Sequence, residues 1–222
     1  MAARLLDSTI GKKAVMAVTG IILVGFVVGH MVGNLQLFLP AHGGEPALDE
    51  YGRFLRSFLH GGGLWVARAV LLGSVIAHIW AAVTLTQRNG AARPVAYRNL
   101  GHSASTLSSR TMIVSGLVVF LFIVYHLLHF TLGSVHPAFH EGKVFHNVVT
   151  GFQVPWVSAF YILAMLALAP HLRHGIWSLF QTLGLSHPRY DRLRPQLALA
   201  ITLLVVAANI SFPVAVLAGV VR

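Results

Sequence analysis

The chain has 222 residues, of which 56% are hydrophobic and only 10% are charged. Soluble domains typically contain about 25% charged residues, so this composition predicts an integral membrane protein. The sequence has no cysteine, which excludes disulfides, thiolate catalysis and cysteine-ligated zinc or iron–sulfur clusters. The net charge of +10 does not indicate a nucleic-acid partner, because the basic residues lie in short connections between apolar stretches, as they do in membrane proteins.

Five apolar stretches are long enough to cross a bilayer as helices, which takes about 20 residues each. The sequence therefore predicts an all-α integral membrane protein, a single membrane domain over residues 1–222 with five transmembrane helices. The connections 40–61 and 134–153 are predicted to be loops, and Pro40, Pro46 and the glycine pair at 43–44 break helix in the first of them. The expected spans are 13–39, 63–87, 110–133, 155–180 and 196–221.

The distribution of basic residues predicts the orientation. Five spans place the termini on opposite sides, and the side away from the N-terminus holds only five of the sixteen lysines and arginines. By the positive-inside rule the N-terminus is expected in the cytoplasm. The five are Arg53, Arg56, Arg68, Lys143 and Arg222.

Histidines are numerous, thirteen in all, and four of them lie deep in separate spans. His30 and His126 lie 17 and 16 residues after the cationic starts of their ascending spans, roughly 25 Å along a helix. His78 and His171 each lie 9 residues before the cytoplasmic ends of descending spans, roughly 13 Å. Four helices thus carry two pairs of histidines at two depths.

Two imidazoles that face each other at one depth suit the axial ligation of haem iron. We therefore expect the first four helices to bundle around two haems b, with His30 and His126 at the outer level and His78 and His171 at the inner level. Each ascending span also has a glycine ten residues before its histidine, Gly20 and Gly116. These glycines would either give a macrocycle room or serve helix–helix contact.

Residues around this core are candidates for binding haem propionates or quinone. His129 lies one turn from His126 and could hydrogen-bond a propionate or a quinone. Lys13, Ser109 and Arg110 lie at the cytoplasmic boundary and could bind the inner propionates; for Arg110 the alternative is a lipid phosphate. A basic cytoplasmic face is expected to contact a partner subunit and anionic membrane lipid; its residues are Arg93, Arg98, Arg189, Arg192 and Arg194.

Motifs along the whole chain resemble one membrane-protein family. They include S-x-I-G-K-K-x-x-M-x-x-T-G at 8–20, GHMVGN at 29–34, SRTMIVSG at 109–116, YHLLHF at 125–130 and PHLRHGIWS at 170–178. Together they resemble the di-haem cytochrome b membrane-anchor subunit of bacterial succinate dehydrogenase and fumarate reductase, the five-helix b558 type of respiratory complex II.

The resemblance implies the function and the partners. Such a subunit sits in the bacterial cytoplasmic membrane and docks from the cytoplasm onto an iron–sulfur subunit, which in turn carries an FAD flavoprotein that oxidises succinate. It passes electrons through the inner and outer haems to a quinone, expected to be menaquinone. An acidic residue in the outer region is tied to quinone protonation in such proteins, and Glu45 and Glu50 lie in the corresponding connection.

Two other functions remain open from the residues. The chain could be the cytochrome b anchor of a hydrogenase or a formate dehydrogenase, with the same haem ligation and a different soluble partner. It could also be a haem-free transporter that uses its buried histidines as proton relays.

Overall fold

The computed structural model describes residues 7–92, 111–185 and 187–222, and within these ranges it contains helices and no β-strand. Five helices are long and apolar enough to cross a membrane, which confirms the predicted all-α integral membrane protein. They are α2 (Thr9–Asn34) with its short extension η1 (Leu35–Phe38), α4 (Gly62–Ala91), α6 (Met112–His126) with its extension η3 (Leu127–Thr131), α8 (Pro155–Thr182), and α9 (Leu193–Leu217) preceded by η4 (Pro188–Tyr190).

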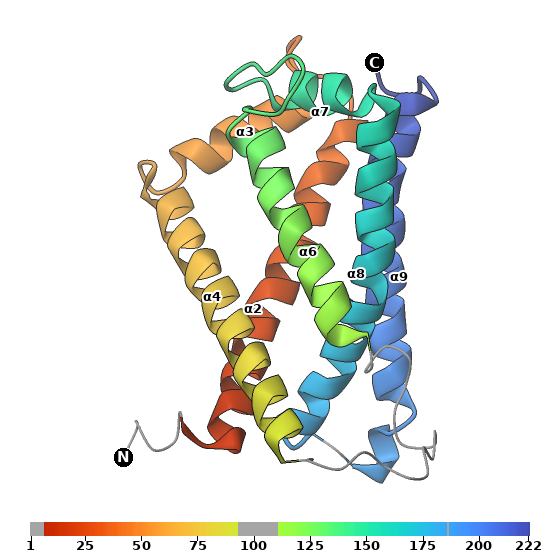
Figure 1. Cartoon of the computed structure of the whole chain (residues 1–222). Helices are drawn as coiled ribbons and strands as arrows, with labels where there is room; N and C mark the ends of the chain where they lie inside the picture. Colours follow the sequence, from red (N-terminus) through yellow and green to blue (C-terminus); the bar gives the residue numbers. More distant parts are fainter. Residues whose placement is uncertain (1–6, 93–110, 186) are drawn as a thin grey trace.

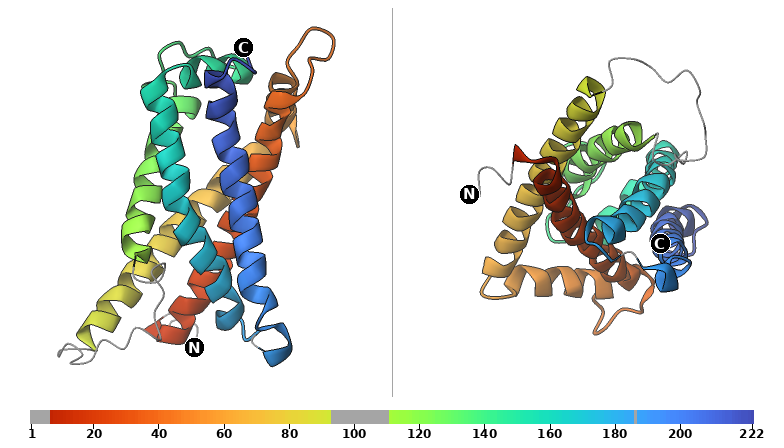
Figure 2. Two further views of the ribbon diagram at one scale, coloured as in Figure 1. Left: turned by 90° about the vertical axis from the view of Figure 1, so that its right-hand side faces the viewer. Right: turned by 90° about the horizontal axis from the view of Figure 1, so that it is seen from below.

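The five spans run alternately up and down, so α2 begins at one end of the bundle and α9 ends at the other (Figure 1). The end where α2 begins is called the inner end below, and the opposite end the outer end. α2 packs against α4, α8 and α9, and α6 packs against α8. α9 lies beside α8 at the edge of the bundle (Figure 2).

Four of the five spanning helices in the described ranges extend beyond the predicted spans at the inner end, whereas α6 begins at Met112, two residues after its predicted start. α2 already begins at Thr9, because the Ser8 side chain caps it by accepting the Gly11 N–H at 2.9 Å. α9 begins at Leu193 and ends at Leu217, shortly before Gly219, whose φ of +71° leaves the helical region. Hydropathy detects only the part of a helix that lies in hydrocarbon, so it misses the turns in the headgroup region.

The predictions of loops at 40–61 and 134–153 were wrong in part, because each segment contains a helix. α3 (Ala47–Ser57) and α7 (Val144–Phe152) lie across the outer end (Figure 1). α3 has acidic residues in its first turn and Arg56 in its last, which suits the helix dipole. The buried Asp49 side chain accepts the Phe145 N–H at 2.7 Å and so connects α3 to α7.

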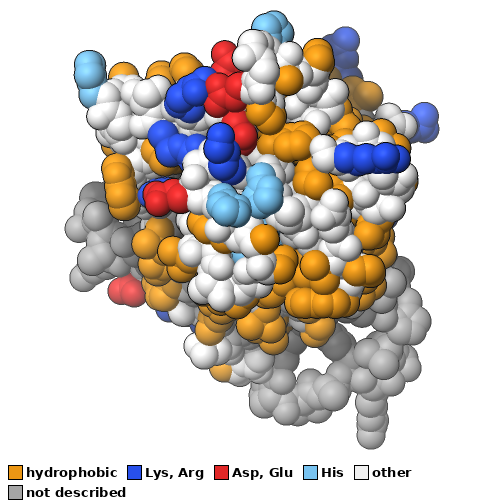
Figure 3. Space-filling model, turned by 90° about the horizontal axis from the view of Figure 1, so that it is seen from above, with side chains coloured by type: hydrophobic (Ala, Val, Ile, Leu, Met, Phe, Trp, Pro, Cys, Tyr) orange, Lys and Arg blue, Asp and Glu red, His pale blue; other side chains and the backbone are white. Residues whose placement is uncertain are grey.

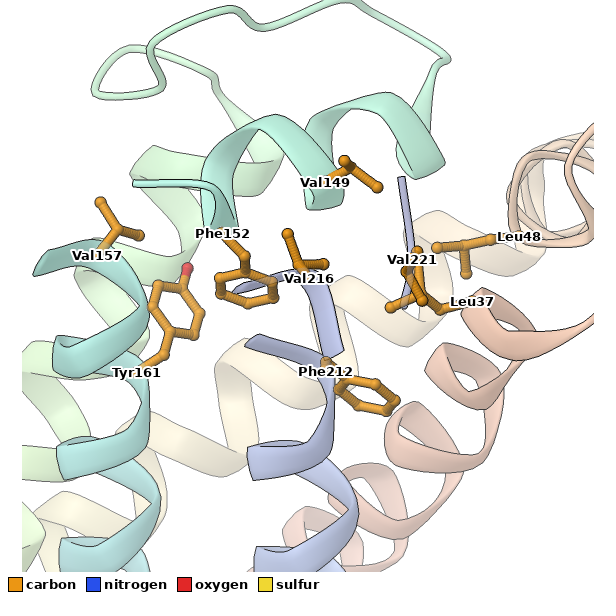
Figure 4. Close-up of a cluster of buried hydrophobic side chains, with 9 residues drawn as sticks. All are labelled: Leu37, Leu48, Val149, Phe152, Val157, Tyr161, Phe212, Val216 and Val221. Carbon is orange, nitrogen blue, oxygen red and sulfur yellow. The ribbon is translucent and has the colours of Figure 1, made fainter. Parts of the chain in front are cut away.

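The main apolar core lies under this outer layer. Figure 4 shows side chains from η1, α3, α7, α8 and α9 meeting there, including Leu37, Leu48, Phe152, Tyr161 and Phe212. Charged and histidine side chains gather on the outer face above this core (Figure 3). Many of the remaining apolar side chains of the spans are exposed on the outside of the bundle, as expected for helices that face lipid.

Candidate functional site

At the inner level, each of two histidines is hydrogen-bonded to a hydroxyl on the preceding span. Nδ1 of His78 on α4 lies 3.0 Å from the hydroxyl of Thr19 on α2. Nδ1 of His171 on α8 lies 3.4 Å from the hydroxyl of Ser115 on α6. The structure therefore gives each of the two predicted inner histidines the same kind of partner.

The direction of these hydrogen bonds determines which imidazole nitrogen is free. The Thr19 hydroxyl donates to the Val15 carbonyl at 2.7 Å, and the Ser115 hydroxyl donates to the Met112 carbonyl at 3.1 Å. Because a hydroxyl has one proton, each then accepts an N–H from the imidazole. With each hydroxyl proton given to its carbonyl, Nδ1 of each histidine would carry the imidazole proton, and Nε2 would keep its lone pair for a ligand.

Gly20 and Gly116 lie directly against these rings. A Cβ at Gly20 would meet His78 Cε1 at 3.8 Å, an ordinary contact. A Cβ at Gly116 would meet His171 Cε1 at 3.3 Å, which is tighter than most real contacts. The absence of a side chain at Gly116 thus allows the close approach of the His171 imidazole.

Thr19 and Ser115 were not singled out from the sequence, although a signal was present. Each immediately precedes the glycine, and each lies eleven residues before the deep histidine of its own span, His30 or His126. α2 with α4 and α6 with α8 therefore repeat one arrangement: a hydroxyl and a glycine on the ascending helix contact a histidine on the descending helix.

At the outer level, the rings of His30 and His126 face each other with centroids 5.8 Å apart and planes at 87°. His30 stacks on Phe26, one turn earlier in α2. Nδ1 of His126 lies 3.4 Å from the hydroxyl of Tyr161 on α8. Outer histidines on α2 and α6 thus meet across the bundle as their depths predicted.

His129 lies in η3 and is fully buried. The backbone widens there, with the Leu132 N–H bonded to the carbonyl of Leu127, five residues back. Nδ1 of His129 lies 3.1 Å from the Tyr161 hydroxyl, and its ring stacks on Tyr125 at 5.5 Å. Nε2 of His129 and the hydroxyl of Tyr125 are buried and have no hydrogen-bond partner in the described part of the chain.

The predicted propionate ligands at the inner boundary are only partly described. Lys13 is exposed, whereas its neighbour Lys12 is 3% exposed and places its amine 4.7 Å from the centre of the Trp80 ring. Ser109 and Arg110 lie outside the described residues.

The basic face is described for its α8–α9 part, where Arg189 and Arg192 are exposed and Arg194 is buried. Arg93 and Arg98 fall outside the described ranges.

The outer acidic residues and loop histidines make local contacts. Glu45 forms an exposed bidentate ion pair with Arg53 at 2.9 and 2.6 Å, and Glu50 is exposed. His136 donates from Nε2 to the Asn147 carbonyl at 2.8 Å and accepts the Ala138 N–H at Nδ1. Both nitrogens of His136 are therefore used within the connection that leads into α7.

Comparison with known families gives one match. A family model described as "Succinate dehydrogenase/Fumarate reductase transmembrane subunit" matches residues 89–208, which include two of the four deep histidines. No curated protein and no solved structure matches the chain significantly.

Proposed function

The chain belongs to the succinate dehydrogenase/fumarate reductase transmembrane subunit family, and on that premise we propose that it is the di-haem cytochrome b anchor of such a complex. His78 and His171 would hold the inner haem b, and His30 and His126 the outer one. Haem supplies reversible one-electron transfer, so two haems at two depths suit electron passage from an iron–sulfur subunit towards a quinone.

The observation that carries the proposal is the inner pair of hydrogen-bonded histidines. Metal-bound histidines almost always donate their other N–H to an oxygen, which fixes the tautomer and the orientation of the ring. Thr19 and Ser115 stand in this relation to His78 and His171. A histidine that only joined two helices by a hydrogen bond would not require the same hydroxyl partner on two separate helix pairs.

The outer pair supports the proposal by distance. An imidazole nitrogen binds a transition metal at about 2 Å, so two imidazoles on opposite sides of a metal have ring centres about 6 Å apart. The centroids of His30 and His126 are separated by 5.8 Å. Within the described ranges no group of three or more His, Asp or Glu side chains could hold a bare ion. Haem iron needs only two protein ligands, because the porphyrin supplies the other four.

The buried donors beside the outer pair suit a quinone. The hydroxyl of Tyr125 and Nε2 of His129 lack partners, and the carbonyl oxygens of a quinone accept hydrogen bonds. When Tyr161 donates its proton to Nδ1 of His129, the nearer histidine at 3.1 Å, Nε2 of His129 becomes the protonated nitrogen. His129 would then donate to a quinone, expected to be menaquinone, rather than to a propionate.

The proposed orientation of the chain in the membrane follows from the distribution of basic residues. By the positive-inside rule the inner end, with its arginines, faces the cytoplasm of a bacterial cell. The iron–sulfur subunit and its FAD flavoprotein would then dock at the inner end, and succinate oxidation or fumarate reduction would take place in those partners. The family match favours this complex over the anchor of a hydrogenase or formate dehydrogenase.

Haem content and ligand variants of the purified chain test the proposal. We expect two haems b per chain in a pyridine haemochrome assay. His78→Ala and His171→Ala should remove the same spectral component, and His30→Ala and His126→Ala the other. His174→Ala, one turn from His171, is the matched control and should retain both. A chain that folds without b-type absorption would instead support the haem-free transporter.

A further inference from the structure

Arg194, the second residue of α9, is a buried cation at the inner end of the bundle. It is 8% exposed. One of its terminal nitrogens, Nη2, binds the Asp191 carboxylate, which is itself half-exposed. Nε and Nη1 are buried and have no hydrogen-bond partner among the residues that the structure describes. Arg189 and Arg192 are exposed to solvent, so Arg194 is set apart from its basic neighbours.

The Arg194 side chain lines a cavity between the end of α8 and the start of α9. The cavity has a volume of about 280 Å³. Apart from Arg194 its walls are apolar or aromatic: Phe180, Leu185, Tyr190, Leu193 and Leu197. The cavity surface is therefore almost wholly apolar, and Arg194 is the one charged residue among those that line it.

A buried guanidinium with unpaired N–H groups is stabilised when it binds an anionic acceptor. Removing a charged group from water is costly unless it is paired and its hydrogen bonds are satisfied. Asp191 engages only Nη2. The Nε and Nη1 hydrogens remain, and the planar fork of arginine is suited to the oxygens of a phosphate or carboxylate.

We propose that this cavity binds the phosphate group of an anionic phospholipid. The guanidinium of Arg194 would hold the phosphate oxygens, and the apolar walls would contact the first carbons of the acyl chains. The position suits a lipid, because the cavity lies where two spanning helices meet the headgroup region. Exposed Arg189 and Arg192 favour a lipid of net negative charge. A carboxylate from a partner subunit is the less favoured occupant, because it would leave the leucine walls uncovered.

Binding of short-chain phosphatidylglycerol to the delipidated full-length chain in detergent tests the site. We expect Arg194→Gln to weaken binding roughly tenfold, as for loss of a hydrogen-bonded charge pair. Arg192→Gln removes the same charge two residues away and should change binding little. Arg194→Lys keeps the charge without the fork and should give an intermediate loss. Phosphatidylcholine should compete poorly with phosphatidylglycerol for the wild-type chain, a result that needs no variant.

Three outcomes would overturn the proposal. Equal weakening by Arg194→Gln and Arg192→Gln would indicate non-specific attraction. Inorganic phosphate that competed as well as phosphatidylglycerol would indicate a site for free phosphate rather than lipid. Unchanged lipid binding by Arg194→Gln, with loss of the iron–sulfur subunit from the complex, would assign the arginine to protein docking. None of these measurements depends on haem, so failure here and failure of the proposed function are distinguishable.

Discussion

Thr19→Val removes the hydroxyl that contacts Nδ1 of His78, together with its bond to the Val15 carbonyl within α2. Thr19 is 8% exposed, and its hydroxyl lies 3.0 Å from Nδ1 of His78. Valine has nearly the same shape as threonine but lacks the hydroxyl. The substitution therefore leaves the packing of α2 in place and removes the hydroxyl partner of Nδ1 of His78.

The size of the effect follows from that hydrogen bond. A hydrogen bond to the distal nitrogen makes an imidazole ligand more basic, so it stabilises oxidised iron more than reduced iron. A buried hydrogen bond contributes about 1 kcal/mol, and for one electron a factor of ten corresponds to about 59 mV. If the full energy of this hydrogen bond favoured oxidised over reduced iron, its loss would raise the midpoint potential of the inner haem by ~40 mV.

The assay is a redox titration of the purified complex, followed at the spectral component that His78→Ala removes. Thr202→Val is the matched control, because Thr202 on α9 is also buried and its hydroxyl donates to the Ala198 carbonyl, a bond within its own helix. Ser115→Ala should give a smaller rise, since its bond is longer at 3.4 Å. Equal potentials in Thr19→Val and Thr202→Val, with both haems retained, would refute the role of this hydrogen bond.

Two further substitutions have matched controls. Gly116→Ala should lower the free energy of unfolding by about 1–3 kcal/mol, because the new Cβ would lie 3.3 Å from Cε1 of His171. Gly20→Ala should have a smaller effect, because its Cβ would lie 3.8 Å from Cε1 of His78. Equal thermal unfolding of the two variants would contradict this. Asp49→Ala should lower the free energy of unfolding by about 1.5–3 kcal/mol, because the buried Asp49 carboxylate accepts a backbone N–H of α7. Glu50→Ala, at an exposed neighbour, should change it little. Limited proteolysis should therefore cut the outer end of the Asp49→Ala variant faster than that of the Glu50→Ala variant.

The sequence was sufficient for the number of spans and for the proximity of His30 and His126. Long apolar runs leave a helix as the only structure that satisfies its own backbone in lipid. A helix rises a constant ~1.5 Å per residue, so counting residues from the cationic ends correctly predicted that His30 and His126 would lie side by side. Both inferences rest on regularities that do not depend on side-chain packing.

The remaining features depend on tertiary contacts that a linear pattern does not contain. α3 and α7 are short and partly polar, and they are helical because the outer core buries one face of each. The role of Tyr161 between His126 and His129 depends on how α8 packs against α6. The buried state of Arg194 depends on the α8–α9 turn. The contacts of Tyr161 and Arg194 have no period or motif of their own, whereas the amphipathic pattern of α3 was present in the sequence.

The contacts of Thr19 with His78 and of Ser115 with His171 each fall within one pair of consecutive spans. This has a consequence for biogenesis. A helical hairpin that enters the bilayer as a unit can orient its own imidazole before the rest of the chain has been synthesised. The two halves would then meet, chiefly through α2 and α8, with one inner histidine on each already set to the same tautomer. Late assembly would thus join two prepared parts and would need no rearrangement of either histidine.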